Sequence, residues 1–273
     1  MQSSPSYVLT RSPQAVRPPP TGGFVGPIAN EGIRYGRGFA SLYTLDNGLN
    51  FGLALIVAGT LANTNMDQSF HRWYQKDVRN DRLDRFSRAC WFFGEGQYFI
   101  PAAVALGVSH RLAVDNGFGS NSAGCHLFGT FASRAGRAYV VGAPALLIGQ
   151  SLLGAGRPSN EDLHFKNSHW QPFKNPNGIS GHAFVGAIPF MTAAKMTDEW
   201  WLRGILYTCS TFTAWSRVND GAHYLSQAIL GWYLAYLTTR AIYQSDGGRL
   251  NRGLTLFPLA QPGVVGMGGQ VRF

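Results

Sequence analysis

The stretch SGHAFVGAIPFMTAAKMTDEWWLRGILYTCSTFTAWSRVNDGAHYLSQ, which occupies residues 180–227, decides the fold. Its interior holds two apolar segments, Ala183–Ala194 and Trp200–Trp215, with the length and composition of helices. Two consecutive helices joined by a short polar loop pack antiparallel, so the chain returns to the side on which it started. The polar residues at the two ends of the stretch are therefore predicted to lie close together.

Further apolar segments extend this hairpin to a larger bundle. They lie at Leu49–Leu61, Tyr98–Val108, Ala138–Gly154 and Tyr224–Tyr243. We expect an all-α fold in which residues 47–243 form a bundle of about six helices. Tyr224–Tyr243 clearly reaches the ~20 residues that a membrane span requires. We therefore expect the bundle to span a membrane.

The composition is basic and only moderately apolar. The chain holds 23 Lys and Arg against 14 Asp and Glu, a net charge of +9, which suits a nucleic acid, an anionic lipid or a phosphorylated substrate. It lacks the aromatic-interleaved basic run typical of single-strand binders, so we expect no nucleic acid partner. A mean hydropathy of −0.06 is modest for a polytopic membrane protein, although polar tails lower the average. Cys90, Cys125 and Cys209 form no C-x-x-C pair and are expected to be buried free thiols.

The two ends of the chain differ from the predicted bundle. Residues 1–46 are rich in Pro, Gly and Ser and predict a flexible tail without a cleavable signal peptide. Residues 244–273 predict a Gly-rich tail that is irregular or strand-like at Leu254–Phe257 and Gly263–Phe273. Within the domain, Met66–Cys90 is charged and predicts an amphipathic helix against the bundle or a membrane surface.

Three short polar motifs fall at one end of the predicted bundle. They are Arg157-Pro158, Ser180-Gly181-His182, and Ser216-Arg217 followed by His223. Each alone has an ordinary explanation, as helix punctuation, an N-cap, or a favourable cation at a helix C-terminus. Together they bring two arginines and two histidines to one place, and such a cluster suits a phosphate group.

The order and spacing of these motifs resemble the signature of the type-2 phosphatidic acid phosphatase superfamily. Lipid phosphatases, bacterial acid phosphatases and vanadium haloperoxidases share this signature. It runs Lys, six residues, Arg-Pro; then Pro-Ser-Gly-His; then Ser-Arg, five residues, His, three residues, Asp, and the sequence keeps these spacings. Three positions depart from it: Gln150 stands at the Lys position, Ile179 at the Pro position and Gln227 at the Asp position.

The resemblance implies a metal-independent phosphatase, without a cofactor, that acts on lipid or isoprenoid phosphates. His223 would attack phosphorus and form a phosphohistidine, His182 would protonate the leaving oxygen, and Gln227 would orient His223. The residues that would bind phosphate are Arg157, Arg217, Ser180, Gly181 and Gln150. Two arginines would supply the positive charge that magnesium supplies in other phosphoryl-transfer enzymes.

The number of predicted spans between the motifs indicates on which side of a membrane the site would lie. If the N-terminus lies inside, all three motifs fall on the outer face, so we expect a bacterial inner-membrane protein with its active site facing the periplasm. The two glutamines leave an alternative, a catalytically inactive member that binds phosphate or a lipid head group. A soluble vanadate-binding oxidase is a third possibility. In the polar loop 159–178, His164 and His169 are expected to be solvated rather than to touch substrate.

Overall fold

The computed structural model describes residues 25–118, 122–159, 167–248, 253–261 and 264–272. Its elements are α1 (Val25–Leu42), α2 (Leu45–Asn63), α3 (Met66–Trp73), the π-helical turn η1 (Tyr74–Val78), α4 (Asp81–Phe92), α5 (Gly96–Asp115), α6 (Ala123–Leu153), α7 (Gly181–Met196), α8 (Trp200–Ser210), α9 (Phe212–Asn219), α10 (Leu225–Ser245), β1 (Gly253–Gln261) and β2 (Val264–Arg272). The body is helical, as predicted, but the described part holds ten α-helices rather than about six.

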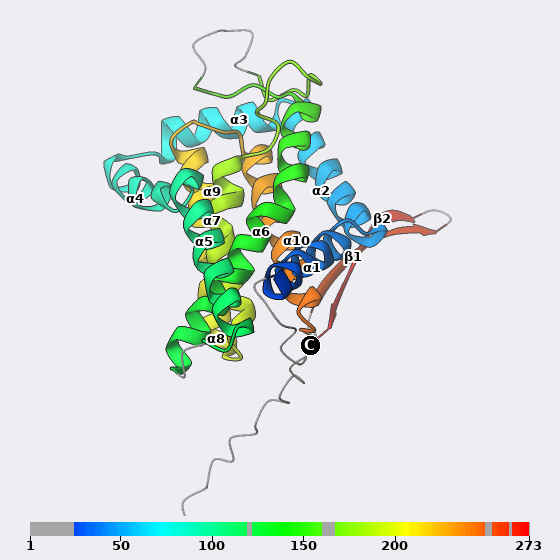
Figure 1. Ribbon diagram of the computed structural model, residues 1–273. Coiled ribbons are helices and arrows are strands. Elements are labelled where there is room, and N and C mark those ends of the chain that lie inside the picture. The colour runs from blue at the N-terminus through cyan, green and yellow to red at the C-terminus, as the bar shows by residue number, and fades with distance from the viewer. Residues whose placement is uncertain (1–24, 119–121, 160–166, 249–252, 262–263, 273) are drawn as a thin grey trace, which may run out of the picture.

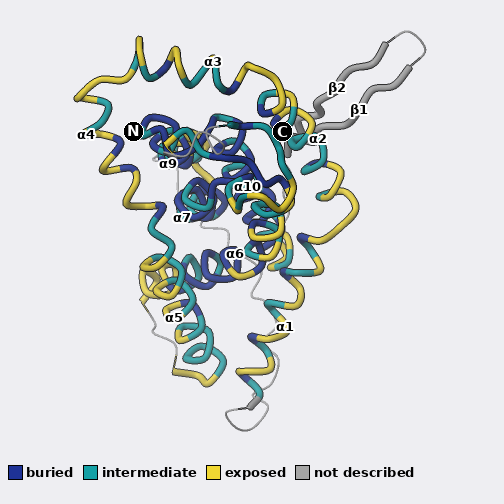
Figure 2. The backbone as a smooth tube through the Cα atoms, turned by 90° about the horizontal axis from the view of Figure 1, so that it is seen from above, coloured by how far each residue is buried: buried dark blue, intermediate teal, exposed yellow. Residues whose placement is uncertain are grey.

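Helices α6, α7 and α10 form the centre of the bundle (Figure 1). Figure 2 shows them as the buried middle, whereas α1 to α5 are more exposed. The apolar core between them includes Val141, Phe184, Ile188, Met191, Leu230 and Leu237. The segment expected to span a membrane, Tyr224–Tyr243, is therefore the enclosed helix α10, of which 12 of 21 residues are buried.

A different helix has the character of a membrane span. Among the described helices, α2 alone is long and apolar enough to cross a bilayer. Only 17% of its most apolar window is buried, which is unlike the core helix of a soluble protein. Large apolar side chains also face outward on α2, α6 and α8, among them Leu49, Ile56, Leu147, Ile148 and Ile205. One such helix is by itself weak evidence of membrane insertion.

The predicted helix Trp200–Trp215 is interrupted. The structure divides it at Thr211 into α8 and α9, and α9 continues to Asn219. The Thr211 hydroxyl donates to the Thr208 carbonyl at 2.7 Å, and the Ser210 hydroxyl donates to the Tyr207 carbonyl at 2.6 Å. Hydroxyls that bond to nearby carbonyls compete with the helical pattern and favour such a break.

The expected N-terminal tail is partly helix. Residues 25–42 form α1, which packs on α10, α6 and α5. The Ser41 hydroxyl donates to the Ala241 carbonyl, and the Tyr43 hydroxyl donates to the Val141 carbonyl, both at 3.0 Å. Tertiary packing thus outweighs the weak helix propensity of a Gly-rich segment. The rest of that tail, residues 1–24, lies outside the described residues.

The C-terminal tail is regular rather than irregular. Strands β1 and β2 pair antiparallel, in a register that runs from Gly253 opposite Arg272 to Gln261 opposite Val264 (Figure 1). Pro262-Gly263 stands between the strands in the sequence, and both residue types favour turns.

The predicted helix Met66–Cys90 consists of three pieces, α3, η1 and α4. Asn80 begins α4, because its side chain accepts hydrogen bonds from the N–H groups of Arg82 and Leu83. Figure 1 shows α3 lying across one end of the bundle. There the Asp67 carboxylate accepts hydrogen bonds from the backbone N–H and the hydroxyl of Ser226, in the first turn of α10.

The three cysteines carry free thiols, as predicted, but only one of them is buried. Cys90 lies in the interior, Cys209 is half-buried and Cys125 is exposed. The expectation of burial was therefore wrong for Cys125, which lies in the first turn of α6.

Candidate active site

The three sequence motifs meet at the end of the bundle across which α3 lies (Figure 1). Arg157 comes from the loop after α6, His182 from the first turn of α7, Arg217 from the last turns of α9, and His223 from the turn before α10. Arg157, Arg217 and His182 all lie close enough to His223 to lower the pKa of its imidazole. The antiparallel packing of α7 with α8 and α9 therefore gathers these four side chains.

Backbone contacts lock the motifs together. The Ser180 N–H donates to the Gln227 carbonyl at 3.0 Å, and the His223 N–H donates to the Arg217 carbonyl at 3.1 Å. Gly231 lets α10 approach this point, since a Cβ there would lie 2.3 Å from the Ser180 carbonyl oxygen. The start of α7 and the start of α10 are thus held in a fixed relation.

The Gln227 side chain joins two of the motifs. Its Oε1 lies 2.8 Å from His223 Nδ1 and accepts a bond from the Tyr224 N–H at 3.2 Å. Its Nε2 donates to the Gly156 carbonyl at 2.7 Å. A backbone N–H can only donate and a backbone carbonyl can only accept, so these two groups fix the orientation of the amide. His223 Nδ1 must then carry the proton, which leaves its Nε2 with a free lone pair.

Burial keeps His223 neutral. Only 1% of the residue is exposed, and it lies among cationic groups. Loss of solvation, together with the positive charge of Arg157, lowers the pKa of His223 to about 3. An unprotonated imidazole nitrogen is what a nucleophile requires at neutral pH.

Two guanidinium groups lack protein partners at one of their nitrogens. Arg157 Nε and Arg217 Nε are both buried and have no hydrogen-bond partner among the described residues. Burial lowers the pKa of each guanidinium, although both remain cations. Arg217 also has a carboxylate neighbour, since its NH1 lies 3.5 Å from Asp220 Oδ2. Buried donors without partners suit an anionic ligand with several oxygens.

The remaining predicted phosphate ligands have local partners. Ser180 is fully buried and caps α7, because its Oγ accepts a bond from the Ala183 N–H at 3.3 Å. Gly181 starts that helix, whose first N–H groups form a site for anions. Gln150 Nε2 donates to the Ile179 carbonyl at 3.0 Å, so its amide supports the loop before Ser180.

Glu95 was missed by the sequence reasoning. It precedes α5, and its Oε1 lies 3.2 Å from His182 Nε2. Trp91 stacks on the same imidazole, with ring centroids 6.3 Å apart and planes 20° apart. The pKa of His182 is lowered, first by burial and then by Arg217, and the bond to Glu95 offsets only part of this shift. The only signal in the sequence is a glutamate between two glycines, Gly94 and Gly96.

Helix α4 supports the turn that carries Arg217 and His223. The Ser87 hydroxyl donates to Asp220 Oδ1 at 2.7 Å, and Asn219 Nδ2 donates to Asp84 Oδ1 at 2.8 Å. Asp84 Oδ1 also accepts a bond from Arg79 Nε at 2.8 Å. Asp84 and Ser87 of α4 thus bind the turn before His223, and Asp84 also binds the residue that follows η1.

His169, the loop histidine that the structure describes, bonds within its own loop. His169 Nδ1 lies 3.0 Å from Asn167 Nδ2, and Asn167 in turn accepts a bond from Gln68 of α3. His164 lies outside the described residues. No group of three or more His, Cys, Asp or Glu side chains in the described residues is placed to hold a metal ion.

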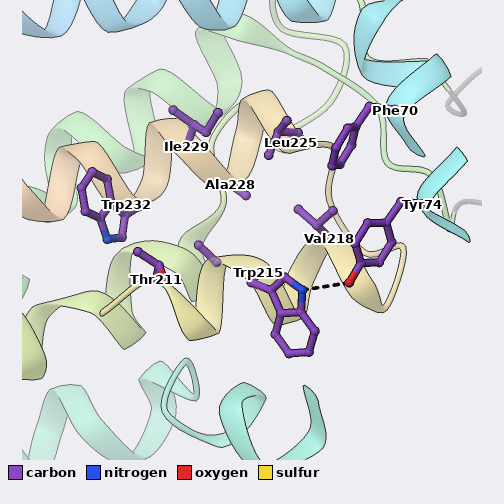
Figure 3. A pocket seen from close by; sticks show the side chains of 10 residues that line it. Phe70, Tyr74, Thr211, Trp215, Val218, Leu225, Ala228, Ile229 and Trp232 are labelled. Atoms are coloured by element: carbon purple, nitrogen blue, oxygen red, sulfur yellow. Dashed lines mark hydrogen bonds between the residues drawn. The ribbon is translucent and has the colours of Figure 1, made fainter. Parts of the chain in front are cut away.

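An apolar cavity of about 270 Å³ lies beside the site, between α3, η1, α9 and α10 (Figure 3). Phe70, Trp215, Leu225 and Trp232 are among its walls, and the Trp215 indole N–H donates to the Tyr74 hydroxyl. Val218 and Thr211 also face it, so the cavity lies on a different side of α9 from Arg217.

A family model supports the resemblance seen in the motifs. The PAP2 superfamily model matches residues 137–250, which include all three motifs and helices α7 to α10. No curated protein and no solved structure matches the sequence significantly.

Proposed function

Since the chain belongs to the PAP2 superfamily through residues 137–250, we propose that it is a phosphatase that acts on lipid or isoprenoid phosphates through a phosphohistidine intermediate. Members of this family generally hydrolyse phosphate esters. The observation that carries the proposal is the neutral His223, with its Nε2 lone pair free, beside two arginines whose buried Nε atoms have no partner among the described residues.

The phosphate would lie between Arg157, Arg217 and the first turn of α7. A phosphomonoester carries about 1.5 to 2 negative charges at neutral pH and has several acceptor oxygens. The unpartnered Nε groups of the two arginines can donate to those oxygens, and the N–H groups at the start of α7 add further donors. Fixed donors of this kind stabilise the charge of the transition state without reorganisation.

The reaction then proceeds in two steps. His223 Nε2 attacks phosphorus while the bond to the alcohol oxygen breaks, and the leaving oxygen takes the electron pair and a proton from His182. His182, now neutral, accepts a proton from water as this water attacks phosphorus, and the bond from phosphorus to His223 Nε2 breaks with its electron pair returning to that nitrogen. Inorganic phosphate leaves, and both histidines return to their starting states.

The surface beside His182 suits a substrate whose leaving group is an apolar alcohol. His182 is the most open of the site histidines, with 35% of its side chain exposed. Next to it an aromatic cluster joins Phe92, Phe93 and Phe99 with Phe190 of α7. Phe92 is 51% and Phe93 38% exposed, so this surface can contact a lipid chain or the bilayer. The exposed apolar face of α2 supports a membrane location, and the inner membrane with a periplasmic site is our proposal.

The two glutamines favour a second candidate, a protein that binds phosphate without turnover. Gln227 supplies no charge to stabilise the imidazolium of His223 in the way an aspartate does. It does, however, hold the correct tautomer, and it donates to Gly156, which an aspartate cannot do. Both the oxygen and the nitrogen of the Gln227 amide have partners. This favours an active enzyme in which Gln227 positions His223 over a member that has lost its activity.

Phosphate release from the detergent-purified full chain tests the proposal. We expect turnover of lipid or isoprenoid monoesters, inhibition by vanadate and loss of activity in His223→Gln. His126→Gln, an exposed histidine on α6, is the matched control and should retain full activity. Binding of vanadate without release from any ester would instead establish the inactive binder.

A further inference from the structure

The geometry points to Glu95 as the residue that makes this site select phosphate monoesters and reject diphosphates. This inference rests on the proposed function and names its substrate class. Glu95 lies outside the three motifs and outside the segment that matches the family model.

The Glu95 carboxylate lies against His182, the residue proposed to protonate the leaving oxygen. Its Oε1 lies 3.2 Å from His182 Nε2, and only 13% of its side chain is exposed. Gly94 permits this approach, since a Cβ there would lie 2.9 Å from His182 Cβ and from Thr213 Cγ2. Glu95 also acts electrostatically on Arg217. Whichever nitrogen of His182 protonates the leaving oxygen, that oxygen and the Glu95 carboxylate contact the same imidazole ring.

A monoester benefits from this arrangement. Its leaving group is an alkoxide, which is strongly basic and must receive a proton as the P–O bond breaks. The Glu95 carboxylate favours the protonated form of His182 and so opposes burial, Arg217 and Arg157, which lower the pKa of that ring. The alcohol itself is neutral and meets no repulsion.

A diphosphate is disfavoured by the same carboxylate. When its terminal phosphorus is attacked, the leaving group is a phosphate monoester, which departs as an anion and needs little help from an acid. This anion would contact the same imidazole ring as the Glu95 carboxylate, in a partly buried place where repulsion between like charges is only weakly screened. The positive groups that could offset it, Arg157 and Arg217, are engaged with the phosphoryl group that is transferred.

A matched pair of substrates tests the inference: an isoprenyl monophosphate and the diphosphate of the same chain length, with the purified full chain. We expect kcat/KM to be at least tenfold higher for the monophosphate. Glu95→Gln keeps a hydrogen-bond acceptor for His182 and removes the charge, so the ratio should fall at least fivefold, partly through a gain on the diphosphate. Glu95→Asp retains the charge and should preserve the preference.

Controls separate this inference from the proposed function. Glu199→Gln removes an exposed carboxylate before α8 and should leave the ratio unchanged. A wild-type preference for the diphosphate, or a ratio that Glu95→Gln does not change, would overturn the role of Glu95 while the phosphatase stands. Release from neither substrate would overturn the phosphatase itself. The pH profile gives a second readout, because Glu95→Gln should move the His182 limb of kcat/KM to lower pH. The titratable and charged groups near this ring are Glu95, Arg217, Arg157 and His223.

Discussion

Gln227 Oε1 lies 2.8 Å from His223 Nδ1, and this contact determines which nitrogen of the imidazole is free to react. The opposite end of the same amide donates to the Gly156 carbonyl, one residue before Arg157. One side chain therefore fixes the tautomer of His223, the proposed nucleophile, and contacts the loop that carries Arg157, a proposed phosphate ligand. Neither role needs a charge, which explains how an amide can stand where the family signature has an acid.

Gln227→Glu tests the two-ended contact. The carboxylate has the same length and can still accept from His223, but it has no N–H group for the Gly156 carbonyl. We expect a loss of about 1–3 kcal/mol of unfolding free energy and a raised KM, because the loop that carries Arg157 loses its tie. Thermal unfolding and initial-rate kinetics measure these effects. Unchanged stability and KM would show that the bond to Gly156 does not position the loop.

Gln227→Leu removes both contacts and is the stronger test of orientation. We expect kcat to fall by up to about 10⁴-fold, since loss of the partner of a catalytic histidine has that effect in a serine protease triad. Vanadate binding should persist, because Arg157 and Arg217 remain. A small change in kcat would mean that burial alone orients His223.

Replacement of Arg217 by lysine separates charge from geometry. Arg217→Lys keeps the positive charge but replaces a planar fork with a point charge, so kcat/KM should fall about 10²–10³-fold. Arg82→Lys, on the exposed face of α4, is the matched control and should have no effect. Activity should also survive EDTA, because the arginines supply the positive charge. Equal kinetics in Arg217→Lys and the wild type would exclude a bidentate role for Arg217.

Acid should destabilise the protein through His223. Its pKa is about 3 in the folded state against an ordinary value of 6.5, so only the unfolded chain binds a proton between these values. A depressed pKa means that the stabilisation is present above pH 6.5 and is lost as the pH falls towards about 3. The contribution has a slope of about 1.4 kcal/mol per pH unit. Urea titrations from pH 7 to pH 4 should show a shallower slope in His223→Gln; identical slopes would argue against a buried neutral His223.

Membrane residence is tested by fractionation. The exposed apolar face of α2 leads us to expect that the protein stays with the membrane after a carbonate wash. Ile56→Asp, on that face, should reduce the retained fraction, because a carboxylate in a spanning helix is costly. Recovery of the wild type in the soluble fraction without detergent would contradict the membrane location.

The sequence predicted those parts of the fold that depend on local composition. Long apolar segments such as Ala138–Gly154 are helices because they bury a continuous core. The break at Thr211 was not predicted, since hydroxyl groups bond to helix carbonyls in intact helices as well. Helix α1 was interpreted as a tail because its glycines weaken helix propensity, and its contact with α10 joins residues 200 positions apart.

In the candidate site, too, the residues in local motifs were predicted and those that depend on long-range contacts were not. Short motifs with fixed spacing marked Arg157, Ser180, Arg217 and His223 as one cluster. Glu95 could not be found in this way, because it reaches His182 from 87 residues away and belongs to no motif. The role of Gln227 also needed the structure, since the partner of its amide nitrogen is a backbone carbonyl that the sequence does not mark.

The contact between Asp67 and Ser226 bears on how a substrate enters. Helix α3 is joined to α10 by this contact and to the Asn167 loop by Gln68, while Gln75 of η1 donates to the Val218 and Asn219 carbonyls. Helix α3 and η1 are thus held to the end of the bundle at several points. They cannot move away without breaking the hydrogen bond between Asp67 and the first turn of α10, the helix that follows His223. Under the proposed function, a substrate would then enter laterally, past Trp91 and His182, and a lipid could present its phosphate to the site while its chain stays in the bilayer.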